Sequence, residues 1–287
     1  MVIIEPPERL GESALSDGRR LAWSEWGAPD ALPVLLCPGA GTSRWLGLDA
    51  AAVRDLGVRL ISVDRPGLGG SDPAPDRTLS SWAADVAEFA RARELERLRA
   101  VGFSQGAPFA LACARAGVVE AVAVVAGTDE LAAPEVRNRL LPDVQQLVAL
   151  TAADAEAARE AFRGVASAEA LRQLVSATSS DVDRVVYDEP AFAAAFRRAL
   201  DEAFVQGVDG YLTDTLLAMA RWPFDPGAIT VRVDLWYGRL DASPVHSPDH
   251  GTTLHRRIPG SRHHLLDDEG AALLWTRTGE VLGSLLR

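Results

Sequence analysis

Residues 102–106 read Gly-Phe-Ser-Gln-Gly and fit the pattern G-x-S-x-G at a junction between two kinds of sequence. An apolar run over residues 98–103 leads into this pentapeptide, and a helical pattern over residues 108–116 follows it. Pro108 suits the first turn of that helix, and Gly117 suits its end. The order of strand, tight turn and helix predicts that Ser104 sits on a sharp, strained turn, where side chains in place of the two glycines would clash. A serine that caps a helix beside incidental glycines is the alternative.

The start of the following helix gives Ser104 a chemical environment. Backbone N–H groups at a helix N-terminus are unpaired and carry a partial positive charge. Such groups stabilise an oxygen that becomes negative during attack on a carbonyl. These features suggest that Ser104 is a nucleophile. A serine hydroxyl is a weak nucleophile, so it requires a base, and the base requires an orienting carboxylate.

The rest of the chain places the pentapeptide in an α/β fold. Short apolar runs bounded by Gly or Pro occupy residues 32–37, 58–63 and 121–126, and helical patterns lie between the runs, as in residues 79–95. This alternation predicts a doubly wound, mostly parallel sheet. From about residue 128 the strand-like runs give way to helical periodicity, and they return at residues 229–237. We therefore expect a helical cap, residues 128–228, inserted in a core formed by residues 1–127 and 229–287.

Composition excludes several classes of protein. The 287 residues carry a net charge of −11, which argues against a binder of nucleic acid. The two cysteines, Cys37 and Cys113, lie in apolar runs and cannot form a disulfide framework. No apolar run approaches the ~18 residues that a membrane helix needs, and the N-terminal residues lack the pattern of a signal peptide. We expect a cytoplasmic location.

Three motifs together resemble the α/β-hydrolase superfamily, in its serine-nucleophile, esterase- and lipase-like branch. They are the pentapeptide, the sequence Pro-Gly-Ala-Gly at residues 38–41, and Asp-Arg-Pro-Gly-Leu-Gly-Gly-Ser at residues 64–71, which is similar to the family turn D-x-P-G-x-G-x-S. The resemblance implies that the backbone N–H groups of Ala40 and Gln105 form an oxyanion hole. Pro38 replaces the usual histidine of the family, but the donor there is a backbone group.

The family order is serine, then aspartate, then histidine. The turn Gly238-Arg239-Leu240-Asp241 follows an apolar strand and resembles the family turn G-x-x-D, so the resemblance makes Asp241 the acid. A surface aspartate in an ordinary turn is the alternative.

The histidine is missing from the place where the family carries it. Residues 258–266 supply the Pro-Gly pair and short strand of the family pattern, and Gly270 should precede a histidine, but the residue there is Ala271. His264 is the candidate for a substitute base and His263 a weaker one, although neighbouring strand residues point to opposite faces. The remaining histidines, at positions 246, 250 and 255, are expected to be solvated.

Three accounts of Ala271 stay open. A catalytic histidine has been replaced by alanine in an otherwise intact site, which gives an inactive or weakened form. In the second account, the protein is a natural non-hydrolytic member that binds a small ligand. In the third, another histidine serves as the base.

The resulting hypothesis is a serine hydrolase that acts on a carboxylic ester, lactone or thioester through an acyl-enzyme on Ser104. The alternatives are a small-ligand binder and a biosynthetic acyltransferase or cyclase. No metal or organic cofactor is expected, since no ligand set has suitable spacing and the glycines of residues 67–70 lack the frame of a nucleotide loop. The expected partner is a small apolar ester-like substrate, without nucleic acid or membrane, and a homodimer stays open.

Overall fold

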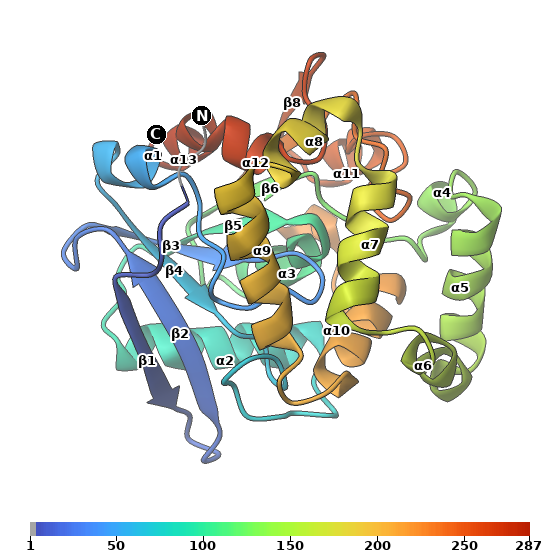
Figure 1. Cartoon of the computed structure of the whole chain (residues 1–287), viewed down its shortest axis with the longest axis horizontal. Helices are drawn as coiled ribbons and strands as arrows, with labels where there is room; N and C mark the ends of the chain where they lie inside the picture. Colours follow the sequence, from blue (N-terminus) through green and yellow to red (C-terminus); the bar gives the residue numbers. More distant parts are fainter. Residues whose placement is uncertain (1–3) are drawn as a thin grey trace.

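The computed structural model describes residues 4–287, in which one eight-stranded sheet is flanked by helices (Figure 1). The strands follow one another across the sheet in the order β1-β2-β4-β3-β5-β6-β7-β8. Their bounds are β1 Arg9–Ala14, β2 Arg20–Trp26, β3 Leu32–Cys37, β4 Val58–Val63, β5 Arg99–Phe103, β6 Ala121–Val125, β7 Arg232–Gly238 and β8 Arg262–Leu266. All neighbouring pairs from β4 to β8 are parallel, which confirms the predicted doubly wound, mostly parallel sheet.

The antiparallel strands β1 and β2 were not expected from the sequence. Residues of β1, an edge strand, alternate between half-buried and exposed, because only one face of this strand is covered. Polar residues on such a strand weaken the apolar signal by which a strand is recognised. The central strands differ, since every residue of β5 and β6 is buried.

Helices on both faces cover the apolar side chains of the sheet. In β3, Leu35 packs in the same cluster as helices α2 and α3, whereas its neighbour Leu36 packs in the cluster of α1 and α13. This alternation follows from the two-residue period of a strand. The core helices are α1 Ala50–Asp55, α2 Leu79–Ala92, α3 Ala107–Arg115, α11 Thr252–Arg257, α12 Leu273–Thr276 and α13 Thr278–Leu285.

The segment between β6 and β7 is helical in the described structure, as its periodicity predicts. It contains α4 Pro134–Arg137, α5 Pro142–Ala153, α6 Ala155–Arg163, α7 Ala168–Thr178, α8 Asp181–Tyr187, α9 Pro190–Ala203, α10 Asp209–Met219 and the short 3₁₀ helix η2 Pro226–Ala228. Figure 1 shows α5 and α6 on the side of the molecule opposite to β1 and β2. We call α4 to α10 the inserted helices.

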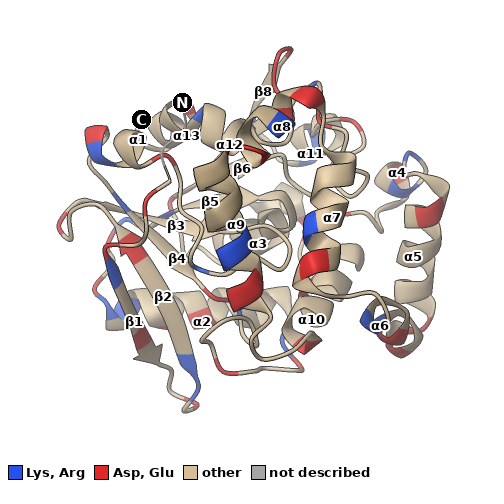
Figure 2. Ribbon diagram, viewed as in Figure 1, with Lys and Arg blue, Asp and Glu red and all other residues tan. Residues whose placement is uncertain are grey.

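The inserted helices are amphipathic. In α9, Phe192 and Leu200 are buried, whereas Arg197 and Arg198 are exposed. Figure 2 shows acidic and basic residues side by side on α7 and α9, so the net negative charge is not gathered on these helices. Between residues 4 and 287, no helix combines the length and the apolar character needed to cross a membrane. Both cysteines are buried and unpaired, as expected.

Candidate active site

Ser104 occupies the sharp turn that the sequence predicts. It follows β5 directly, opens the 3₁₀ helix η1 Ser104–Gly106, and has a φ of 50°, in the left-handed region that non-glycine residues rarely adopt. A Cβ on Gly106 would lie 2.0 Å from the Cys37 carbonyl oxygen, and one on Gly102 would lie 2.9 Å from the Cα of Ala107. The two glycines therefore let helix α3 approach the strands closely enough to form the turn.

The hydroxyl of Ser104 lies in a hydrogen-bonded chain with two other side chains. Its Oγ is 2.7 Å from Nε2 of His246, and Nδ1 of the same imidazole is 2.7 Å from Oδ2 of Asp241. His246 is only 7% exposed, so water competes little for these bonds. This is the geometry of a nucleophile, a general base and an orienting carboxylate.

The loop after β7 folds back on itself to bring Asp241 and His246 together. The other carboxylate oxygen of Asp241, Oδ1, accepts a hydrogen bond of 3.0 Å from the Ser243 N–H, and the His246 N–H donates to the Ser243 carbonyl at 3.4 Å. A short aspartate side chain that bonds the backbone two residues on stabilises such a turn. Five residues of separation are therefore enough for the acid and the base to meet.

The account in which the replacement of a histidine by Ala271 leaves the site without a base does not fit the structure, because His246 is hydrogen bonded to both Ser104 and Asp241. The expectation that His246 is solvated is wrong for the same reason. Sequence reasoning missed this residue because it searched for the histidine after β8. The signal available was the spacing in Asp-Ala-Ser-Pro-Val-His, where Pro244 stiffens a turn begun by Asp241.

Ala271, at the position where a histidine was expected, lies beside the site, and its side chain is only a methyl group. It is 8% exposed and lines the same cavity as Ser104 and His246. An inserted helix holds its loop in place: Oδ1 of Asp183 in α8 accepts a hydrogen bond of 2.7 Å from the Ala272 N–H. A Cβ on Gly270 would lie 2.4 Å from the same carboxylate. The loop is thus shaped for close packing against α8.

His264, the substitute base suggested by the sequence, has another role. Its Nε2 lies 2.9 Å from Oδ1 of Asp234, and its ring stacks on Trp236 at a centroid distance of 3.9 Å. His263 points to the other face of β8, where its Nε2 contacts the carbonyl oxygen of His250 at 2.6 Å. Neither histidine lines the cavity of Ser104 among the described residues, so the prediction of a substitute base on β8 is wrong.

Ala40 and Gln105, the residues implied for the oxyanion hole, both line the cavity with Ser104. A Cβ placed on Gly39, the residue before Ala40, would be 3.6 Å from the Cβ of Ser104. The Ala40 N–H has no hydrogen-bond partner between residues 4 and 287. Gln105 follows Ser104 in the first turn of η1, where N–H groups lack intrahelical acceptors.

The cavity above Ser104 has a volume of about 290 Å³ and lies between the sheet and the inserted helices. Its walls are mostly apolar, and no Asp, Glu or Arg lines it in the described part of the chain. Side chains from the inserted helices form much of the wall, among them Val144, Leu147, Phe162, Leu171, Phe196 and Met219. A pocket of this kind suits an uncharged, largely apolar ligand.

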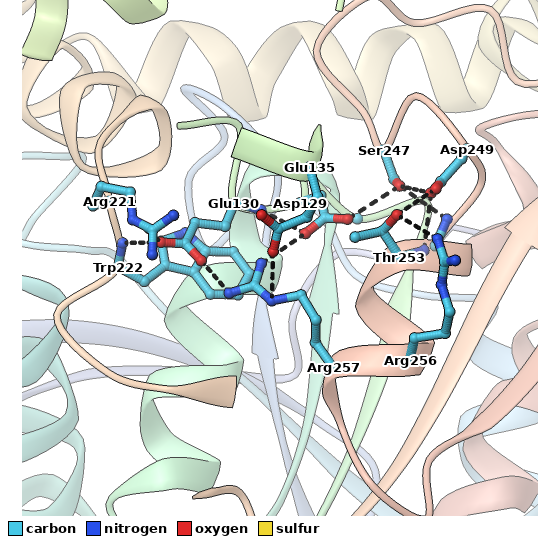
Figure 3. A network of polar contacts seen from close by, with 12 residues as sticks. Asp129, Glu130, Glu135, Arg221, Trp222, Ser247, Asp249, Thr253, Arg256 and Arg257 are labelled. Carbon is cyan, nitrogen blue, oxygen red and sulfur yellow. Dashed lines mark hydrogen bonds and ion pairs between the residues drawn. The ribbon is translucent and has the colours of Figure 1, made fainter. Parts of the chain in front are cut away.

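A network of polar residues supports the loop that carries His246 (Figure 3). The hydroxyl of Ser247 contacts Asp249 at 3.2 Å and Asp129 at 3.5 Å, and it accepts a hydrogen bond of 2.9 Å from the Gly251 N–H. The Ser247 N–H donates to the Gly127 carbonyl at 3.1 Å, which ties this loop to the end of β6. The backbone next to the imidazole is therefore held from two sides.

Asp129, at the other end of this network, is fully buried. Burial raises the pKa of its carboxyl to about 6, against the lowering effects of the Glu130 N–H and of Arg257. Arg257 also pairs with Glu130, which in turn contacts Arg221. Figure 3 shows these side chains converging between the end of β6 and helix α11.

A sequence model described as the alpha/beta hydrolase family matches residues 34–276. This match runs from Val34 within β3 through β8 and covers the inserted helices and every residue of the hydrogen-bonded chain around Ser104. The protein belongs to the alpha/beta hydrolase family, which supports a hydrolase as its class of enzyme.

Comparisons with individual proteins agree with the family. A non-heme chloroperoxidase of Streptomyces lividans is 34% identical over 102 residues, which are 34% of this chain and 36% of that protein, so the match spans about a third of the relative. An enol-lactonase from Burkholderia xenovorans superposes with a TM-score of 0.71 at 21% identity, covering 96% of this chain and 99% of the other. An esterase from a Rhodococcus species gives 0.66 at 19% identity, with 96% of each chain covered. At these identities, the two structures establish the shared fold.

Proposed function

We propose that this protein is a serine hydrolase that cleaves a carboxylic ester, lactone or thioester through an acyl-enzyme on Ser104. The observation that carries the proposal is the hydrogen-bonded chain from Ser104 Oγ to His246 Nε2 and from His246 Nδ1 to Asp241, with 2.7 Å at each step. A serine in this chain can lose its proton as it attacks, which a free serine at neutral pH does not do.

In the first half of the reaction, Ser104 Oγ attacks the carbonyl carbon while His246 Nε2 takes the hydroxyl proton. The carbonyl oxygen becomes negative and accepts hydrogen bonds from the N–H groups of Ala40 and Gln105. The tetrahedral intermediate then expels the alcohol or thiol, which takes the proton from His246. Asp241 holds the Nδ1–H throughout, which keeps Nε2 free to accept a proton.

In the second half, water replaces the leaving group. His246 removes a proton from the water as the water oxygen attacks the acyl carbon. The intermediate collapses, the bond to Ser104 Oγ breaks, and Oγ recovers its proton from His246. The products are the carboxylic acid and the free enzyme.

The cavity supports an uncharged substrate with an apolar acyl or alcohol portion, because its walls offer apolar side chains and, among the residues described, no Asp, Glu or Arg as a counter-ion. We also propose that the inserted helices act as a cap, since α5, α6, α7 and α10 contribute side chains to the wall opposite the sheet. A capped site limits the access of water to the reacting centre.

The alternatives differ in how well the site supports them. A protein that only binds a small ligand has no need for a base bonded to both Ser104 and Asp241, so the complete chain of hydrogen bonds favours turnover. Acyl transfer to an alcohol uses the same acyl-enzyme, so it is a second outcome of the same chemistry. Adding an alcohol to the assay and measuring the ester product distinguishes transfer from hydrolysis.

The test is activity together with covalent labelling of Ser104. We expect the purified chain to hydrolyse p-nitrophenyl butyrate and to react with a fluorophosphonate, which displaces fluoride and bonds to Oγ. Ser104→Ala should abolish both, whereas Ser176→Ala, at an exposed position of α7, should retain both. Labelling of another residue, or esterase activity unchanged in Ser104→Ala, would contradict the proposal.

A further inference from the structure

A buried group of three charged side chains lies beneath the proposed oxyanion hole. Arg65 Nε is 2.5 Å from Asp214 Oδ2, and Arg77 Nη2 is 2.5 Å from the other oxygen of the same carboxylate. The side chains of Arg65 and Asp214 are completely buried, and that of Arg77 is 2% exposed. Taking three charges out of water is costly, and such groups are weak evidence for stability. The contacts of Arg65 with the backbone before Ala40 indicate a role other than stability.

The guanidinium of Arg65 reaches the backbone that carries Ala40. Its Nη1 donates to the Pro38 carbonyl at 2.8 Å, and its Nη2 donates to the Gly39 carbonyl at 3.0 Å. Both donors belong to one planar fork, so the two carbonyls are fixed relative to each other. The short segment between β3 and Ala40 is therefore held by Arg65.

The Gly39 carbonyl and the Ala40 N–H belong to the same peptide unit. This unit is trans and planar, so its C=O and N–H point in opposite directions. A hydrogen bond that fixes the carbonyl on one side therefore fixes the direction of the N–H on the other side. The Ala40 N–H, which has no partner between residues 4 and 287, faces away from Arg65.

Helix α10 contributes to both residues of the proposed oxyanion hole through neighbouring positions. Asp214 holds Arg65 and, through it, the Gly39–Ala40 peptide. Thr215, the next residue, accepts a hydrogen bond of 3.2 Å from the side-chain amide of Gln105. Helix α10 is thus hydrogen bonded to Arg65, which holds the peptide of Ala40, and to the side chain of Gln105.

We propose that Arg65 is a positioning residue that aims the Ala40 N–H at the developing oxyanion, and that Asp214 of α10 fixes Arg65 for this purpose. The inference rests on the proposed function, because the oxyanion forms only if Ser104 attacks a carbonyl. It adds that the cap and the oxyanion hole form one hydrogen-bonded unit, so a shift of α10 alters the rate of the chemical step as well as access to the cavity.

The test separates binding of the oxyanion from binding of the ground state. A trifluoromethyl ketone forms a hemiketal with a nucleophilic serine and places an oxyanion in the hole, whereas the methyl ketone of the same chain length binds without reaction. In Arg65→Lys, one ammonium cannot replace the fork. We expect kcat and trifluoromethyl ketone affinity to fall roughly 10- to 100-fold, as for a misaligned group. KM and methyl ketone affinity should stay within about threefold.

Arg77→Lys is the matched control. Arg77 is buried and bonds the same carboxylate, but it donates to the Gly210 carbonyl and has no bond to Pro38 or Gly39. We expect this variant to lose thermal stability while it keeps the ratio of the two ketone affinities. An equal loss of that ratio in Arg77→Lys, or an unchanged ratio in Arg65→Lys, would overturn the inference.

If Arg65→Lys does not fold, as judged by circular dichroism, the ratio of the two ketone affinities in Asp214→Asn tests the inference instead. This variant keeps Arg65 and removes the charge that holds Nε, so the ratio should fall in the same direction, and an unchanged ratio would reject the inference. Failure of the proposed function gives a different result, since the unaltered protein would then bind both ketones alike and show no esterase activity.

Discussion

The loops after β7 and β8 both reach the site, but they contribute to it in opposite ways. The loop after β7 carries Asp241 and His246, which are hydrogen bonded to each other and to Ser104. The loop after β8 carries Ala271, which offers only a methyl group to the cavity, and Asp183 fixes the backbone next to it. The comparison teaches that a histidine can meet the serine and the aspartate from the loop after β7, because the position of its ring nitrogens matters and not the loop that carries it.

The largest effect expected from this comparison concerns the acid. Asp241→Asn keeps the size of the side chain but no longer fixes Nδ1 of His246 as the donor, so the imidazole loses its required tautomer. We expect kcat to fall roughly 10³- to 10⁴-fold with p-nitrophenyl butyrate. Asp267→Asn, on the loop after β8, is the control, since that carboxylate is exposed and pairs with Arg239. An equal fall of kcat in Asp241→Asn and Asp267→Asn would contradict the idea that only the loop after β7 takes part in the chemistry.

A smaller effect is expected from the support of the His246 loop. Ser247→Ala deletes the hydroxyl that contacts Asp249 and Asp129, which loosens the backbone beside the imidazole. We expect kcat to fall about tenfold, or about 1.4 kcal/mol of barrier. Ser261→Ala, next to β8, removes a hydroxyl that is also buried and bonded to the backbone. This control should lose stability and keep kcat, and a similar fall in kcat there would contradict the idea.

Ala271 provides a prediction about specificity. Ala271→Leu adds volume to the cavity wall and leaves the hydrogen bonds of Ser104 in place. We therefore expect kcat/KM to fall most for substrates with long acyl chains. We expect the ratio of kcat/KM for p-nitrophenyl octanoate over the acetate to fall roughly three- to tenfold, as for a few methylene groups in a pocket. A loss of a hundredfold or more with the acetate would instead place residue 271 in the chemistry.

The smallest expected effect on activity comes from substituting Asp129, because its ionisation changes how the stability of the fold depends on pH. Its folded pKa is raised to about 6 by burial, above the value near 3.8 in the unfolded chain. The folded state therefore binds the proton more tightly, and stability is lost as the pH rises from about 4 to about 6. Asp129→Asn lacks this loss.

Relative to the unaltered protein, the free energy of unfolding of Asp129→Asn should therefore increase over that interval, by about 1–3 kcal/mol. Urea unfolding at pH 4.5 and pH 7.5 measures the difference. A constant difference between the two proteins at both pH values would show that Asp129 ionises normally.

The parts of the fold with a local cause could be predicted from the sequence. The turn at Ser104 was predicted because a strand, two glycines and a helix must meet there within a few residues, and its φ of 50° agrees. The central strands were predicted because burial on both faces makes them apolar throughout. The edge strand β1 was missed because burial on one face leaves a mixed pattern.

His246, the proposed base, was missed because its contact with Ser104 spans 142 residues and follows from the path of one loop. The sequence contained five histidines, and only three-dimensional distance separates His246 from His264. His246 lies on the loop after β7, one strand earlier than the family pattern places the histidine. The spacing of Asp241 and His246 was present in the sequence, but it gains meaning only when the turn through Ser243 is known.

The most direct measurement is the rate of fluorophosphonate labelling of Ser104 in three variants, with mass spectrometry to locate the label. The account predicts that His246→Ala lowers the labelling rate and kcat/KM for p-nitrophenyl butyrate by about 10³-fold or more. It predicts that His264→Ala leaves both within about threefold, and that Ala271→His added to His246→Ala restores neither. A labelling rate in His246→Ala within tenfold of the unaltered protein, or recovery in the double variant, would contradict the assignment of His246 as the base.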